Sequence, residues 1–414
     1  MGAMSPSQVP AESSSHTGWR RPEILLLLMA SGVPLSFATW MALLNNFAIE
    51  VSAFSGSDMG ILQSVREVPG FLALLVVFAL YLMREQTLAV VSLALLGIGT
   101  ALTGYFPSLI GLCLTTLLMS TGFHYYETVQ QSLTLQWTET HRTAEVLGRL
   151  IAVGSFAGIV SYGLVWLGFR WAGIDYVSTY MIAGGLTLVI AIAAATLFPR
   201  FPQRVEQHRT LILRRRYWLF YALIFMAGAR RQIFMVFAAF MLVQKFGYAV
   251  EEIALLFLLN NALNIPLAPY IGRLIGRFGE RPALVFEYAG LILVFTGYAF
   301  VSNAFAAAGL YILDHLFFAL AIAIRTYLQK IADPADMAST AGVSFTINHI
   351  AAVVIPVAFG FVWLVSPAAV FLCGAAMSIV SLILALLVPD EPGPGNEVVA
   401  LGMTPAAGRA GGAP

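Results

Sequence analysis

The chain has 414 residues, of which 59% are hydrophobic and only 10% are charged. About 25% of the residues in a water-soluble globular domain are charged, so this composition excludes such a domain. The formal net charge of +1 gives no basis for nucleic-acid binding, and two cysteines are too few for a disulfide framework. The apolar residues suffice instead for roughly twelve membrane-spanning helices of about 20 residues each. We therefore predict an all-α polytopic membrane protein.

Apolar runs between charged, glycine, proline or asparagine breaks predict six helices in the first part of the chain, near residues 23–48, 57–82, 87–105, 108–130, 148–169 and 176–197. Six more are predicted near residues 217–244, 252–271, 282–301, 305–327, 341–364 and 367–388. The chain then divides into a polar tail (1–21), a six-helix bundle (22–198), a basic central loop (199–216), a second six-helix bundle (217–389) and a Gly- and Pro-rich tail (390–414). We expect both tails to be disordered because neither can bury a core.

The distribution of basic residues predicts the orientation in the membrane, because Lys and Arg near the ends of spans resist translocation. With the N-terminus inside, the outer loops carry only Arg170 and Lys245. The cytoplasmic side carries fifteen basic residues: Arg20, Arg21, Arg84, Arg142, Arg149, Arg200, Arg204, Arg209, Arg214, Arg215, Arg216, Arg273, Arg277, Arg281 and Lys330. Both termini are therefore expected in the cytoplasm, with an even number of spans.

Two features relate the halves to each other and to a known family. At an offset of 197 residues, Met29, Phe37, Gln63, Glu67 and Pro69 fall opposite Met226, Phe234, Asn260, Asn264 and Pro266. The segment GRLIGRFGER (272–281), between the eighth and ninth predicted helices, resembles the GxLxDRxGRR loop motif of the major facilitator superfamily. Gly276 stands where that motif usually has Asp.

This resemblance covers the whole transmembrane region. It implies two six-helix bundles that rock around a central cavity lined by helices 1, 4, 7 and 10. It also implies that Gly272, Arg277 and Arg281 take part in gating. The glycine-rich fifth helix lacks the proline of the family's antiporter signature, which disfavours drug/proton exchange.

Ionisable side chains at membrane depth indicate functional positions, since each costs at least about 2.5 to 3.5 kcal/mol at mid-helix unless it faces a partner or water. Arg230 and Arg231 lie near the middle of helix 7, about 100° apart around the helix axis. Each either contacts an anionic or polar substrate or pairs with a carboxylate of a neighbouring helix. In helix 2, Gln63 is a candidate substrate contact, Glu67 a candidate proton carrier and Arg66 a gating residue, or the two charges form a structural pair.

Helix 4 carries a polar stripe of Ser120, His124, Glu127 and Gln131 at helical spacing, with Tyr126 beside it as a candidate substrate contact. His124 and Glu127 are candidates for proton coupling, and structural pairing is the alternative. The spacing of the two residues would also suit two metal ligands, but it indicates no third, so we predict no metal site.

In the second half, Asp314 and His315 of helix 10 are candidates for proton coupling, and Arg325 is a candidate gating residue. The family resemblance implies that Glu127 and Arg325 can meet across the two halves and close the cytoplasmic side. The remaining candidate substrate contacts are asparagines, for which interhelical hydrogen bonding is the alternative: Asn260 and Asn264 of helix 8 and Asn348 of helix 11.

Together these features predict a multi-pass secondary transporter of a bacterial inner membrane, monomeric, without a cofactor, moving a small polar or anionic solute by alternating access in symport with protons. Anion preference follows from three arginines against two carboxylates at mid-depth. A transporter-like sensor or scaffold and a multidrug or metabolite efflux carrier are the alternatives. An enzyme is disfavoured because the sequence has no HExxH, GxSxG or paired-cysteine motif.

Overall fold

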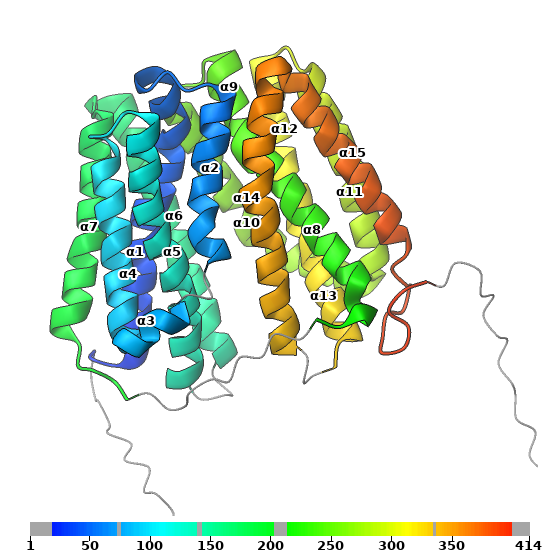
Figure 1. The fold of residues 1–414 in the computed structure, drawn as a ribbon, viewed down its shortest axis with the longest axis horizontal. Coiled ribbons are helices and arrows are strands. Elements are labelled where there is room, and N and C mark those ends of the chain that lie inside the picture. Colours follow the sequence, from blue (N-terminus) through cyan, green and yellow to red (C-terminus); the bar gives the residue numbers. More distant parts are fainter. Residues whose placement is uncertain (1–18, 73–75, 139–142, 203–212, 334–336, 400–414) are drawn as a thin grey trace, which may run out of the picture.

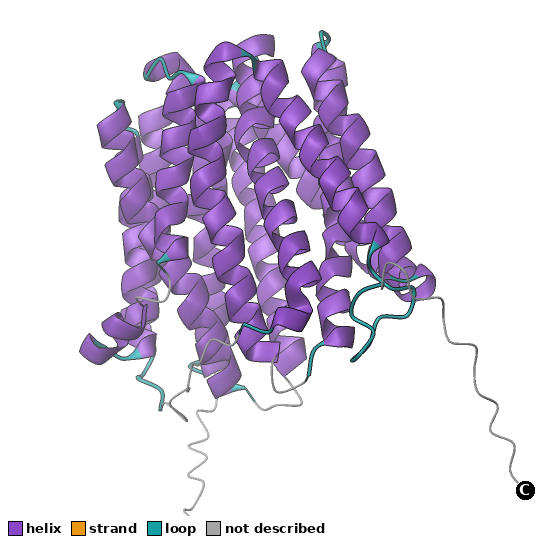
Figure 2. Cartoon of the chain, turned by 45° about the vertical axis from the view of Figure 1, so that its right-hand side comes forward, coloured by secondary structure: helices purple, strands orange, loops and turns teal. Residues whose placement is uncertain are grey.

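The computed structural model describes residues 19–72, 76–138, 143–202, 213–333 and 337–399, and these residues fold almost entirely as helices (Figure 2). The predicted tail residues 1–18 and 400–414, together with Arg142, Arg204 and Arg209, lie outside the described residues. The first part of the chain forms α1 (Pro22–Asn46), α2 (Gly56–Phe71), α3 (Val76–Leu82), α4 (Glu85–Thr103), α5 (Leu109–Trp137), α6 (Thr143–Leu167) and α7 (Tyr176–Leu197). The second part forms α8 (Trp218–Gln232), α9 (Ala239–Phe246), α10 (Val250–Phe278), α11 (Glu280–Phe300), α12 (Ala304–Phe318), α13 (Ile322–Ile331), α14 (Met337–Val365) and α15 (Pro367–Leu386).

The helices stand side by side, with α1 to α7 gathered on one side of the molecule and α8 to α15 on the other (Figure 1). The start of α1 and the end of α15 lie at the same end of the bundle, here called the terminal end. The opposite end, where α1 is followed by α2 and α9 by α10, is called the distal end. Apolar side chains such as Trp40, Phe237 and Tyr288 fill the interior of the two groups.

Ten helical segments among the described residues are long and apolar enough to cross a membrane. They correspond to all the predicted spans except 57–82 and 108–130. Of the helices in these two stretches, α2 has only 16 residues and α5 is rich in polar residues. The prediction of one continuous span over 57–82 was wrong, because α2 ends at Phe71, two residues after Pro69. Most of the segment 272–281, which resembles the family's loop motif, is helical, because α10 continues to Phe278. Gly279, with φ of 90°, makes the turn into α11.

Residues 390–399 are the described part of the predicted C-terminal tail, and they are ordered against the bundle. The Asp390 carboxylate pairs with Arg281 at 3.1 Å, and the backbone carbonyl of Glu397 accepts a hydrogen bond from the Tyr327 hydroxyl. The backbone amide of Val399 donates to the carbonyl of Leu387 at 2.9 Å. This segment is therefore held to the terminal end next to α11 and α13.

The two groups of helices meet closely at the distal end. There α2 packs along α14, in the centre of Figure 1, and α6 packs along α10. A Cβ atom at Gly60 would lie 3.0 Å from the Cα of Gly360, so only glycine allows this approach. The backbone amide of Val357 donates to the Ser64 hydroxyl at 3.0 Å, and the Asn46 amide donates to the Tyr248 carbonyl at 2.7 Å. These contacts close the distal end of the interface between the halves.

Candidate functional site

A cluster of ionisable side chains lies at mid-depth where α2, α5 and α14 meet. Glu67 comes from α2, His124 from α5 and His349 from α14, and all three are buried. One ligand atom from each lies within 4.8 Å of the others, and Glu67 Oε2 is 3.8 Å from His349 Nε2. We call these residues the carboxylate–histidine cluster. It joins the two halves, because α14 belongs to the second half and the other two helices to the first.

Local structure holds this cluster in place. Arg66 donates to Glu67 Oε1 through Nε at 3.1 Å and also through Nη2, while the backbone carbonyl of Arg66 accepts a hydrogen bond from the Ser120 hydroxyl. Gly70 leaves the space that the histidines occupy, because a Cβ there would lie 2.8 Å from Cε1 of His124. The structure thus places Arg66 and Glu67 in a buried ion pair, the structural alternative considered for these two charges.

An aromatic wall borders the cluster. Phe37 of α1 stacks on Phe123 of α5 with ring centroids 4.3 Å apart, and Phe123 meets the His124 ring edge-on at 5.0 Å. On the other side, Phe345 lies against the His349 ring at 4.1 Å. Both imidazoles are therefore packed against aromatic rings.

Three charged residues toward the terminal end are exposed, although they lie in the interior between the halves. Glu127 of α5, Arg231 of α8 and Arg325 of α13 form this exposed charge group. Arg231 lies within electrostatic range of both other members and of Arg66 and Glu67. The exposed charge group therefore brings charges of the two halves within electrostatic range of one another while their side chains stay exposed. No ion pair joins Glu127 to Arg325 in the described part of the chain, so their closing contact stays a prediction.

A second cluster is sealed inside the second half. Arg230 of α8, Glu287 of α11 and Asp314 of α12 have 0% exposure and form what we call the buried triad. The Arg230 guanidinium lies 3.8 Å from Glu287 Oε1 and stacks over the Tyr288 ring at 4.3 Å, and its Nε donates to the Met226 carbonyl at 3.2 Å. Arg230 therefore points away from the space that Arg231 faces. It meets a carboxylate of a neighbouring helix, the alternative considered for this residue, and its role as a substrate contact stays a prediction.

The other predicted site residues are scattered around these groups. Gln63, Tyr126 and Asn260 are buried, and Asn264 and Asn348 are half-buried. His315 packs between the rings of Tyr311 and Phe234, at 5.2 and 4.9 Å. Gly272 and Arg277 are exposed at the terminal end of α10, and Arg281 pairs with Asp390. The structure does not bring these residues into one site.

Sequence reasoning missed Glu287. Glu287 is the single acid in the apolar segment LVFEYAG, within the helix predicted near residues 282–301. The cost of burying a charge in the membrane, which selected Asp314 as a candidate, could have selected Glu287 as well. The place of His349 beside Glu67 depends on helix packing between residues 282 positions apart in the sequence.

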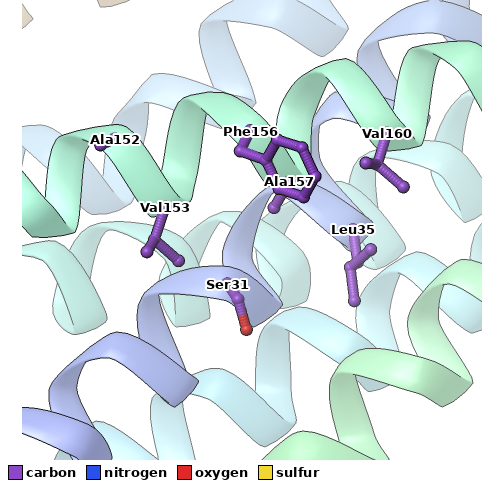
Figure 3. Close-up of a pocket in the computed structure, with 7 residues that line it drawn as sticks. All are labelled: Ser31, Leu35, Ala152, Val153, Phe156, Ala157 and Val160. Atoms are coloured by element: carbon purple, nitrogen blue, oxygen red, sulfur yellow. The ribbon is translucent and has the colours of Figure 1, made fainter.

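An apolar groove of about 420 Å³ runs between α1 and α6, away from these charged groups (Figure 3). Figure 3 shows Leu35, Val153, Phe156 and Val160 along its walls, and its one polar lining side chain, Ser31, already donates to the Leu28 carbonyl at 2.7 Å. The groove therefore offers no free polar group to a polar solute.

The family model for the Major Facilitator Superfamily matches residues 24–356, most of the chain. The chain belongs to this superfamily. No curated protein matches it in sequence. The predicted family resemblance is thus confirmed, and the superfamily identifies a membrane transporter that acts on small molecules.

Solved structures of superfamily transporters share the fold. A mutant of the nucleoside transporter NupG superposes with a TM-score of 0.73 at 16% identity, over 88% of this chain and 99% of that one. A bacterial homologue of the human lysosomal transporter Spinster, in an inward-facing and occupied conformation, gives 0.70 at 13% identity, over 88% and 95% of the two chains. At these identities the likeness describes the fold and not the substrate.

Proposed function

We propose that this protein is a proton-coupled secondary transporter for a small polar or anionic solute, with its terminal end in the cytoplasm. The observation that carries the proposal is the exposed charge group. Two arginines of the second half and one glutamate of the first are exposed, Arg231 interacts electrostatically with the other two, and the halves pack together at the distal end. Arg231 and Arg325 offer guanidinium groups suited to carboxylate or phosphate oxygens. The strongly basic terminal end supports the cytoplasmic orientation.

The first prediction concerns Arg231. Uptake is measured in proteoliposomes with a panel of small carboxylates, phosphate esters and nucleosides, the last because a fold neighbour transports nucleosides. Arg231→Ala should lower uptake of an anionic solute by roughly 10-fold or more, since a hydrogen bond to a charged group contributes about 1.5 to 3 kcal/mol. Arg170→Ala, an exposed arginine at the distal end, is the matched control and should transport normally. Equal uptake by the Arg231 variant and the wild type would count against an anion site.

The buried triad supports proton coupling. Arg230 lies 3.8 Å from Glu287 and within electrostatic range of Asp314, and none of the three is exposed, so the triad carries a net negative charge unless one carboxyl group holds a proton. A net charge without a partner is strongly disfavoured in such surroundings. We place the coupling proton on Asp314 or Glu287. Movement of α11 or α12 relative to Arg230 would then release it.

The second prediction tests that placement. Asp314→Asn keeps the shape of the side chain but fixes its neutral form. It should abolish accumulation driven by a pH gradient while leaving solute exchange at equal pH, as measured with labelled solute and an internal pH dye. Glu145→Gln, an exposed acid in α6, serves as control. Wild-type accumulation by the Asp314 variant would remove the triad from the coupling mechanism.

A further inference from the structure

The carboxylate–histidine cluster has the composition of a metal site, and the proposed function leaves this feature unused. Two imidazoles and one carboxylate offer ligand atoms within 4.8 Å of one another, and each residue is at most 8% exposed. Such a His₂Glu set suits divalent transition metals and leaves one position open for water or a further ligand. The sequence paired His124 with Glu127 and indicated no third ligand, whereas helix packing brings Glu67 and His349 to His124 and leaves Glu127 outside the cluster.

The tautomer of His349 is fixed for metal binding. Its Nδ1 lies 2.8 Å from the Phe345 carbonyl oxygen. A carbonyl only accepts hydrogen bonds, so Nδ1 carries a proton, and in the neutral imidazole Nε2 then has the free lone pair. Nε2 is the atom that faces Glu67. Metal-binding histidines commonly donate their second ring N–H to a backbone carbonyl in this way.

His124 and Glu67 complete the arrangement. Nδ1 of His124 is buried without a hydrogen-bond partner among the described residues, a condition that is unfavourable in a protein interior. Arg66 occupies Oε1 of Glu67, so Oε2 is the oxygen left toward the histidines. The guanidinium orients the carboxylate and balances its charge.

We propose that Glu67, His124 and His349 bind one divalent transition-metal ion, for which Zn²⁺ is the probe. Two ligands come from the first half and one from α14 of the second. A bound ion therefore joins the halves at mid-depth and stabilises the conformation closed at the distal end. This inference concerns a site apart from the exposed charge group and the buried triad, and it stands or falls independently of the transported solute.

The binding test uses the full chain, purified in detergent and stripped of metals with a chelator. Titration with Zn²⁺ against a chromophoric competitor should give one site per chain. His124→Ala and His349→Ala should each weaken binding by at least about 10- to 100-fold, the loss typical even of residues that only support a ligand. His315→Ala removes a histidine of α12 outside the cluster and should leave the affinity unchanged. X-ray absorption should detect nitrogen and oxygen neighbours of the bound zinc.

A second variant keeps all three ligands but fills their space. Gly70→Ala introduces a Cβ against both histidines and should weaken Zn²⁺ binding. Thermal unfolding of each metal-free variant checks that it is folded, and Zn²⁺ should raise the melting temperature of the wild type and the His315 variant but not of the others. Absence of a Zn²⁺ site, sulfur ligation through Cys113 or Cys373, or unchanged affinity in both His124 and His349 variants would overturn the proposal.

Discussion

Gly60 and Gly360 set how closely the two halves approach at the distal end. Because a Cβ at Gly60 would lie 3.0 Å from the Cα of Gly360, a larger residue must push α2 and α14 apart. We predict that Gly60→Val destabilises the distal-closed conformation by about 1 to 3 kcal/mol, the usual cost of overpacking. Reaction of a cysteine placed at Ser64 with a thiol reagent should become faster. Gly154→Ala, with open space around its Cβ, should leave the rate unchanged, and an equally unchanged rate in the Gly60 variant would show that this contact does not hold the closure.

At the scale of single residues, the sequence predicted which charged side chains lie deep in the membrane but not which residues they contact. Helical spacing placed His124 and Glu127 on one helix, and it placed Arg230 and Arg231 at different angles around another. It left open that Arg230 turns into the second half toward Glu287, because that pairing depends on how α8 packs on α11. For the same reason the sequence predicted most of the charged residues of the site, though not Glu287, and it did not predict their division into three groups.

At the scale of elements, helix starts follow local chemistry that the sequence displays. Asp175 caps α7: the Ser178 backbone amide donates to Asp175 Oδ1 at 2.8 Å and the Ser178 hydroxyl donates to Oδ2 at 3.0 Å. Helix ends were harder to predict, because α10 continues through the polar segment 272–278 until Gly279 adopts a positive φ. The π-helical segment Ile233–Ala238 between α8 and α9 also has no proline or glycine to announce it.

The cap of α7 gives a pH prediction outside the membrane. The hydrogen bonds from Ser178 lower the pKa of the Asp175 carboxyl group below its ordinary value. The cap therefore contributes fully above the ordinary carboxyl range, and its contribution is lost as pH falls through the lowered pKa, below about 4. Amide exchange at Ser178, corrected for the intrinsic rate, should lose protection over that range. Asp175→Asn should show no such step, and a step of equal size in that variant would assign it to another group.

At the scale of the molecule, composition and basic-residue counts predicted a helical membrane protein, and the superfamily match and the fold agree with that class. Ten apolar spans were recognisable from hydrophobicity alone. The conformation, closed at the distal end, could not be predicted from hydrophobicity. It depends on contacts between residues far apart in the sequence, such as Gly60 with Gly360 and Asn46 with Tyr248. One sequence must also be compatible with two conformations, one closed at each end, because alternating access requires both.

The central claim is that the halves alternate between closure at the distal end and closure at the terminal end. Spin labels at Ser57 and Val365 report on the distal end, and labels at Glu145 and Gln329 report on the terminal end, in a chain whose Cys113 and Cys373 are replaced by Ala. Distances are measured in nanodiscs with and without the transported solute, at neutral and acidic pH. We predict two populations whose balance shifts, the distal distance lengthening as the terminal distance shortens. One unchanging distance at each end under every condition would contradict alternating access.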